Sequence, residues 1–194
     1  MGLVRVTGIG DTLAMSERLD RLASDLGRRL ALHGLTLTTA ESCTGGWVAK
    51  VVTDIAGSSA WFDRGFVTYG DLAKQDMLGV SPATLGAHGA VSEAVVREMA
   101  LGALARSRAQ VALATSGIAG PAGGSEDKPV GTVWFAWVLP GAIEGTAAGG
   151  EPQAQVWSQL LQFAGDREEV RHQAVRVALE RLLELLPEPA QPGG

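Results

Sequence analysis

A polar segment at residues 41–46, with the sequence ESCTGG, holds the side chains best suited to nucleophilic chemistry. Ser42 lies between a predicted strand, residues 35–40, and a predicted helix, residues 47–55. The free N–H groups and the positive dipole end of such a helix stabilise negative charge that develops beside them. The spacing therefore predicts a nucleophilic serine with an oxyanion site in the same turn.

Serine is a poor nucleophile at its ordinary pKa, so Ser42 needs a base. The three histidines lie far apart in the sequence, and none is an obvious base. Lys74 follows the only tyrosine, Tyr69, by five residues. The two bracket the turn from a predicted strand at 61–69 into a short predicted helix at 71–78. A buried lysine can lose its proton near neutral pH. We therefore consider a Ser42, Tyr69 and Lys74 site; the alternative is an exposed lysine beside a tyrosine at the rim of the core.

Two neighbours of Ser42 have competing interpretations. Cys43 is the better intrinsic nucleophile, but adjacent residues on an extended turn point in different directions, and a lone cysteine is most often simply buried. We therefore rank Cys43 below Ser42. Glu41 either orients the lysine or caps the helix that follows, and both interpretations stay open.

A second loop, residues 116–124, reads SGIAGPAGG and follows a predicted buried strand at 110–115. Its glycines let backbone amides approach a ligand and form an anion-binding nest, for which phosphate or carboxylate is the natural guest. The alternative is a plain connecting loop. Arg167 adds a guanidinium that can clamp a phosphate, or else lies at a solvated helix start capped by Asp166.

The remaining pattern alternates helices and strands around these loops. The further predicted elements are helices at 16–34, 92–107 and 166–186 and strands at 132–138 and 155–163. Ser16 is the expected N-cap of the first helix, and residues 139–152 form a surface connection. Such alternation favours an α/β fold with helices on both faces of one sheet, whose ligands bind at the carboxyl ends of the strands.

Composition limits the classes of protein. The 194 residues are 46% apolar and 19% charged, which is typical of a globular domain. A single cysteine excludes a disulfide scaffold and zinc fingers, and a net charge of −5 without a basic cluster disfavours nucleic acid. The apolar stretch at 131–143 is shorter than the roughly 20 residues of a membrane span. Without a leader segment, we expect a cytoplasmic protein with one domain at 16–186, an N-terminal extension at 1–15 and a tail at 187–194.

Five motifs in a fixed order carry a family resemblance. They are TAESCTGG at 39–46, FVTY at 66–69 followed by Lys74, GAVS at 89–92, SGIAGP at 116–121 and KPVGTV at 128–133. Together they resemble the C-terminal domain of the competence/damage-inducible CinA family in its stand-alone form, over roughly residues 16–186. The resemblance implies a three-layer α/β/α sandwich with one mixed, mostly parallel sheet.

The resemblance also implies an activity: hydrolytic deamidation of nicotinamide mononucleotide to nicotinate mononucleotide and ammonia. Ser42 would be the nucleophile, Lys74 the base and Tyr69 a proton relay or orienting group, with the oxyanion near the amides of residues 44–46. The expected substrate-binding residues are Glu41, Thr44, Gly45, Gly46, Ser116, Gly117, Gly120, Gly123 and Arg167. No metal and no cofactor are expected, and the protein is expected to be a homo-oligomer.

One departure from the family pattern bears on the base. The family often has Ser-Asn after the tyrosine, where this chain has Gly70 and Asp71. A carboxylate near Lys74 would favour the charged amine and oppose its role as base. Two other functions remain as alternatives: a regulatory module that binds a pyridine nucleotide without turnover, and hydrolysis of some other amide by the same serine.

Overall fold

The strand β1, Leu37–Glu41, is buried along its whole length in the computed structural model, which describes residues 9–141 and 154–188. β1 pairs in parallel with β2, Phe62–Val67, on one side and with β3, Val111–Gly117, on the other. β4, Thr132–Leu139, and β5, Gln155–Gln162, continue the sheet with antiparallel pairings, so that four of the five strands run in one direction. The expected mixed sheet is confirmed.

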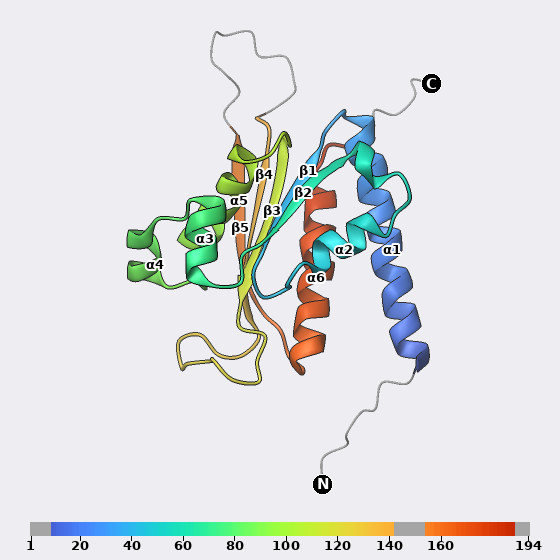
Figure 1. The fold of residues 1–194 in the computed structure, drawn as a ribbon. Coiled ribbons are helices and arrows are strands. Elements are labelled where there is room, and N and C mark those ends of the chain that lie inside the picture. Colours follow the sequence, from blue (N-terminus) through green and yellow to red (C-terminus); the bar gives the residue numbers. More distant parts are fainter. Residues whose placement is uncertain (1–8, 142–153, 189–194) are drawn as a thin grey trace.

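Helices cover both faces of this sheet (Figure 1). On one face lie α2, Trp47–Thr53, and α6, Arg167–Leu185, and the long α1, Ile9–Leu32, packs across both. Their apolar side chains form one buried cluster with the sheet. This face therefore carries the helix that directly follows the ESCTGG segment.

The opposite face is covered by α5, Glu93–Ala105, which contacts β1, β3 and β4. Two shorter helices pack against α5, namely α3, Asp71–Leu78, and α4, Pro82–His88. A 3-10 turn, Ser58–Ala60, precedes β2. A second buried cluster fills this layer, which confirms the three-layer α/β/α arrangement.

Strand periodicity assigns the residues of β1 to these two layers. Leu37 belongs to the core on the α2 and α6 side, whereas Ala40 belongs to the core on the α5 side. Because side chains alternate along a strand, Glu41 faces α2 and Ser42 is turned toward the layer that holds α3. The two neighbours therefore serve different helices.

Strand and helix ends differ from expectation by one to three residues at several elements, and two differences are larger. The first helix begins at Ile9 and not at Ser16, which is an exposed residue inside it, because a solvent-facing serine costs a helix little. α4 was not predicted, although Ser81 caps it and Pro82 stands at its first position, which is a recognised helix start. Residues 1–8 of the expected extension, 142–152 of the expected connection and 189–194 of the tail lie outside the described residues.

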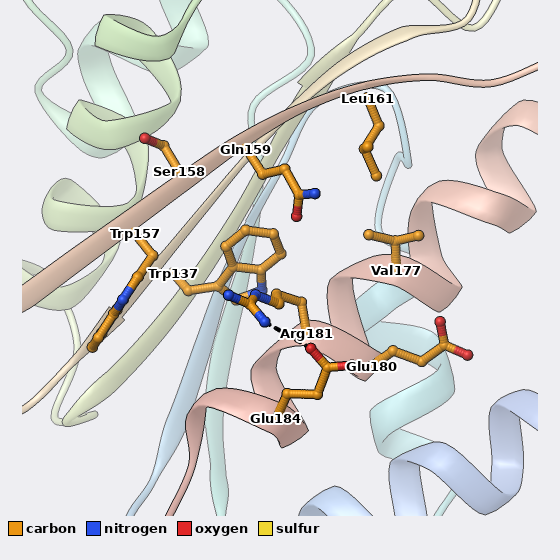
Figure 2. A pocket seen from close by; sticks show the side chains of 9 residues that line it. All are labelled: Trp137, Trp157, Ser158, Gln159, Leu161, Val177, Glu180, Arg181 and Glu184. Atoms are coloured by element: carbon orange, nitrogen blue, oxygen red, sulfur yellow. Dashed lines mark hydrogen bonds and ion pairs between the residues drawn. The ribbon is translucent and has the colours of Figure 1, made fainter.

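A pocket of about 470 Å³ lies between β5 and α6 (Figure 2). Apolar side chains, among them Trp137, Trp157 and Val177, line it, and an ion pair joins Arg181 to Glu184 at 2.8 Å. None of the expected site residues lines this pocket, so we do not assign the chemistry to it. Within residues 9–141 and 154–188, no helix combines the length and apolar character that crossing a membrane would require.

Candidate active site

Glu41 ends β1 and anchors the nucleophile loop, residues 42–46. Its carboxylate is buried and accepts hydrogen bonds from the N–H groups of Gly46, Val48 and Ala49 at 2.8–3.0 Å. The Thr44 hydroxyl adds a fourth donor at 2.7 Å. The three N–H donors are amides at the start of α2 that have no partner within the helix. The structure therefore shows Glu41 as the helix cap, one of the two interpretations left open by the sequence.

Ser42 and Lys74 meet in the opposite layer. The Nζ of Lys74, on α3, lies 3.1 Å from Ser42 Oγ, and the Lys74 residue is only 1% exposed. Nζ also donates to the carbonyl oxygens of Thr68 at 2.9 Å and Tyr69 at 3.4 Å. A neutral amine keeps two N–H groups for these two carbonyls, which leaves its lone pair for the serine hydroxyl. This geometry is what a lysine base requires.

Burial also sets the protonation of Lys74. Desolvation lowers the pKa of the amine below its ordinary value, because a buried site disfavours the charged form. The Asp71 carboxylate raises the pKa, as its position in the sequence indicated, but its effect is smaller than that of burial. The departure from the family pattern therefore weakens the activation of the lysine without reversing it.

Cys43 is the neighbour that could compete with Ser42. Its side chain is buried in the core on the α2 and α6 side, away from the layer of Lys74. Burial raises the pKa of the Cys43 thiol to about 12, so the reactive thiolate is scarce near neutral pH. The structure thus supports the ranking of Cys43 below Ser42.

The amides of the nucleophile loop correct one expectation. Gly45 N–H donates to the carbonyl of Ser42, and Gly46 N–H donates to Glu41, each at 3.0 Å. Neither amide is free to receive an oxyanion, because both serve the turn and the helix cap. The Cys43 amide bonds to its own thiol, so that in the described part of the chain the Thr44 amide is the loop amide without a protein acceptor.

Tyr69 contacts the pair through its backbone and not through its ring. Its side chain is exposed, and its hydroxyl accepts a hydrogen bond from Arg167 at 2.8 Å. Only its carbonyl reaches Lys74. Among the contacts of the described residues, none links the Tyr69 hydroxyl to Ser42 or Lys74, so this geometry does not support the expected proton relay.

The glycine loop, residues 118–131, joins β3 to β4 beside this site. Arg167, at the start of α6, donates to the Gly120 carbonyl at 2.8 Å and so ties the glycine loop to Tyr69. Gly120 and Gly123 have positive φ angles, which glycine adopts without strain. Across the described ranges, the amides of these two glycines have no protein acceptor and face no competing hydrogen bond.

Two other expected ligand residues, Ser116 and Gly117, serve the packing of the strand end. The Ser116 hydroxyl donates to the Ala90 carbonyl at 2.7 Å. A Cβ added at Gly117 would lie 2.7 Å from the Thr132 carbonyl oxygen, so only glycine fits between the strands. The beginning of the expected nest is therefore part of the fold, and its exposed part starts after the buried Gly120, at Pro121.

Sequence reasoning missed Arg171. From α6 its guanidinium donates to the carbonyls of Cys43 at 3.1 Å and Thr44 at 2.8 Å, and it lies 5.3 Å from the ring centroid of Trp47. Its spacing of four residues from Arg167, on one face of a predicted helix, was the available signal. Within the described ranges, no group of three or more His, Cys, Asp or Glu side chains could hold a metal ion.

The fold and the site together define an α/β protein with a lysine-paired serine at the carboxyl ends of parallel strands. The model of the CinA C-terminal domain family matches residues 19–186, and the chain belongs to this family.

Relatives of known name support this family assignment along most of the chain. The nicotinamide-nucleotide amidohydrolase PncC of Escherichia coli K12 is 57% identical over 164 residues, which cover 84% of this chain and 92% of that protein. PncC of Pseudomonas putida is 49% identical over 84% of this chain and 94% of its own length. A crystal structure of a competence/damage-inducible protein from Agrobacterium tumefaciens is 46% identical, with a TM-score of 0.77 over 87% of this chain and 95% of that one.

Proposed function

We propose that this protein hydrolyses the carboxamide of nicotinamide mononucleotide to nicotinate mononucleotide and ammonia, with Ser42 as nucleophile and Lys74 as base. Two findings support the proposal. The names of relatives that match most of the chain specify a nicotinamide-nucleotide amidohydrolase. The observation that carries the mechanism is the 3.1 Å contact between the Lys74 amine and the Ser42 hydroxyl in a buried site.

The reaction runs in two steps. Neutral Lys74 takes the hydroxyl proton as Ser42 Oγ bonds to the carboxamide carbon, and the carbonyl oxygen becomes an oxyanion. As the oxyanion collapses, the C–N bond breaks, and the nitrogen leaves as ammonia with the proton from Lys74. Water, deprotonated by the same amine, then attacks the acyl-serine. The ester C–O bond breaks, the nicotinate nucleotide is released, and Lys74 returns its proton to Ser42 Oγ.

The phosphate of the nucleotide is assigned to Arg167 and the free amides at Gly120 and Gly123. Arg167 has five N–H donors, two of which are used by the protein, so others remain for a ligand. The N-terminus of α6 is not assigned this role, because Asp166 caps it and its first turn contains Glu168 and Glu169, which repel an anion. Tyr69 is assigned to the rim of this subsite.

Positioning roles, rather than substrate contacts, are assigned to several other expected ligand residues. These residues are Glu41, Gly45, Gly46, Ser116 and Gly117, whose polar or packing contacts are already made within the fold. Thr44 contributes its hydroxyl to the Glu41 network and keeps its amide for the substrate. We further propose that the protein is cytoplasmic and forms a homo-oligomer. Light scattering after size-exclusion chromatography measures the oligomeric state.

The decisive experiment measures ammonia released from nicotinamide mononucleotide by the purified protein with a chelator present. We expect turnover by the parent protein and its loss, by at least about 10³-fold, in Ser42→Ala. Ser58→Ala changes another buried serine on a 3-10 turn outside the site and is the matched control. Retained turnover in Ser42→Ala would overturn the assigned nucleophile.

The other outcomes of this experiment point to different functions. Tight binding of the nucleotide by calorimetry without ammonia release would favour a regulatory binding module. Equal turnover of nicotinamide riboside, which lacks the phosphate, would remove the role assigned to Arg167 and the glycine loop and would favour a broader amidase.

A further inference from the structure

The Cys43–Thr44 peptide is held from outside the nucleophile loop, by α6. Arg171 Nε donates to the Cys43 carbonyl at 3.1 Å, and Arg171 Nη2 donates to the Thr44 carbonyl at 2.8 Å. The Thr44 carbonyl also accepts Trp47 N–H at 3.2 Å. Within the described residues, Arg171 is the only partner of the Cys43 carbonyl, so the orientation of this one peptide plane depends on the guanidinium.

The planar peptide bond fixes the direction of the Thr44 N–H relative to the Cys43 carbonyl. In a trans peptide the C=O of one residue and the N–H of the next lie in one plane and point in opposite directions. Fixing the Cys43 carbonyl toward α6 therefore aims the Thr44 N–H away from α6. The Thr44 amide also has no protein acceptor in the described ranges, whereas the Cys43 amide bonds to its own thiol.

We propose that Arg171 is a positioning residue that aims the Thr44 amide at the oxyanion formed when Ser42 attacks a carboxamide. The inference rests on the proposed function, because it concerns the transition state of that reaction. It also explains how the nucleophile loop provides an oxyanion donor although the amides of Gly45 and Gly46 are occupied.

Two surrounding contacts make Arg171 suited to this role. Its guanidinium lies 5.3 Å from the Trp47 ring centroid, and stacking on an aromatic face restricts the side chain to one orientation. A Cβ added at Gly45 would lie 3.2 Å from Arg171 Nη2, so the loop approaches the guanidinium closely. The positive charge behind the Cys43 carbonyl also polarises the peptide and strengthens its N–H as a donor.

The test compares arginines on the same helix. Arg171→Met removes both hydrogen bonds, and we expect kcat to fall about 10²-fold with KM within about threefold, since a lost oxyanion donor typically costs about 10²- to 10³-fold. Arg171→Lys keeps the charge but loses the two-pronged geometry, so we expect a smaller loss of roughly 10-fold. Arg176→Lys changes a partly buried α6 arginine paired with Glu180 and should leave kcat unchanged.

A second readout separates positioning from general stability. In the 3-formylpyridine analogue of the mononucleotide, an aldehyde replaces the carboxamide. Ser42 Oγ would bond to the aldehyde carbon, the hydroxyl proton would pass to Lys74, and the aldehyde oxygen would become the oxyanion of the adduct. We expect Arg171→Met to weaken this adduct by the same factor as kcat while binding of the product nucleotide is unchanged. Guanidinium ion added to Arg171→Ala should restore part of kcat, and guanidinium added to the parent protein should not increase it.

Each result has a distinct meaning. Unchanged kcat and unchanged aldehyde affinity in Arg171→Met would overturn the inference, as would an effect confined to KM. If Arg171→Met unfolds, the split between kcat and KM in Arg171→Lys decides. Failure of the proposed function looks different, because the parent protein itself would then release no ammonia.

Discussion

The two loops at the carboxyl ends of β1 and β3 are built in opposite ways. In the nucleophile loop, a buried carboxylate, a turn hydrogen bond and an arginine from α6 hold successive peptide groups. In the glycine loop, residues 121–127 are exposed. Its contacts from outside are made by the Gly120 carbonyl to Arg167 and by Lys128 to the His88 carbonyl, near its two ends, and a turn between Ser125 and Lys128 orders the exposed part. Both loops nevertheless border one site, because the strands they follow are direct neighbours in the sheet.

This difference separates the two tasks of an amidohydrolase. Catalytic groups act best when their geometry is fixed before the reaction, since reorganisation during the reaction costs rate. A loop that grips a ligand has to admit and release it, and exposed backbone amides allow this. Changes in the nucleophile loop should therefore reduce kcat, and changes around the glycine loop should raise KM.

The largest effect is expected from Lys74→Met, which removes the proposed base and leaves a side chain of similar length. We expect kcat to fall about 10²- to 10⁴-fold, the typical contribution of a general base. In the parent protein, the rate should rise with pH through the lowered pKa of Lys74, because only the neutral amine accepts the serine proton. The pH dependence of kcat is measured for both proteins, and circular dichroism checks that the variant is folded. A pH–rate profile that Lys74→Met leaves unchanged would contradict the assignment of Lys74 as base.

The same pKa shift affects stability. Since the pKa of Lys74 is lower in the folded protein than in the unfolded chain, the unfolded chain binds more protons between the two values. The free energy of unfolding should therefore rise with pH across that window. Urea titrations of the parent protein at several pH values should show the rise, and Lys74→Met should abolish this part of it.

Glu41→Ala should have the next largest effect, mainly on stability. It leaves three amides at the start of α2, one of them fully buried, without an acceptor, and we expect the free energy of unfolding to fall by about 3 kcal/mol. Because the nucleophile loop loses its anchor, kcat should also fall, roughly 10-fold. Glu98→Ala removes the carboxylate that accepts the Ser81 N–H and the Thr84 hydroxyl at the start of α4, and should lower stability by less and without lowering kcat. Equal effects of both variants on kcat would mean that Glu41 has no special link to the site.

Glu41 also shows how far the sequence alone reaches. Hydrophobic periodicity predicted the strand and the helix around residues 41–46, and strand alternation accounts for Glu41 and Ser42 facing opposite layers. The choice between a capping and a ligand-binding carboxylate depended on where the amides of α2 point, which no local pattern encodes. The pairing of Lys74 with Ser42 was expected from residue types, but their 3.1 Å contact depends on how α3 packs over the sheet.

Other residues could not be placed from local patterns. Arg171 acts on a loop more than 100 positions earlier in the chain, and only the packing of α6 beside α2 makes the contact. The exposed Tyr69 looked like a partner of Lys74 because the two are close in sequence, yet its hydroxyl is turned to Arg167. Long-range packing therefore decides which neighbours in the sequence become neighbours in the site.

A moderate effect, on KM alone, is expected from Arg167→Gln. This change removes the charge assigned to the phosphate and the contact with the Gly120 carbonyl, so we expect KM to rise roughly 10-fold with kcat within about twofold. The difference should shrink at high salt, which screens an exposed charge. Arg181→Gln, which breaks the ion pair with Glu184 elsewhere on α6, is the control. A fall in kcat without a change in KM would place Arg167 with the nucleophile loop.

The smallest effect is expected from Asp71→Asn, which tests how a surface carboxylate changes the pKa of the buried Lys74 beside Ser42. The exposed Asp71 carboxylate raises the pKa of Lys74, so an amide at this position should lower that pKa further. The rising limb of the pH–rate profile should then move to lower pH, while the plateau at high pH stays the same because the neutral amine is unchanged. Asp76→Asn removes another exposed carboxylate of α3 and should leave the limb where it is. A shift to higher pH would mean that another group, and not the amine held beside Ser42, limits the rate.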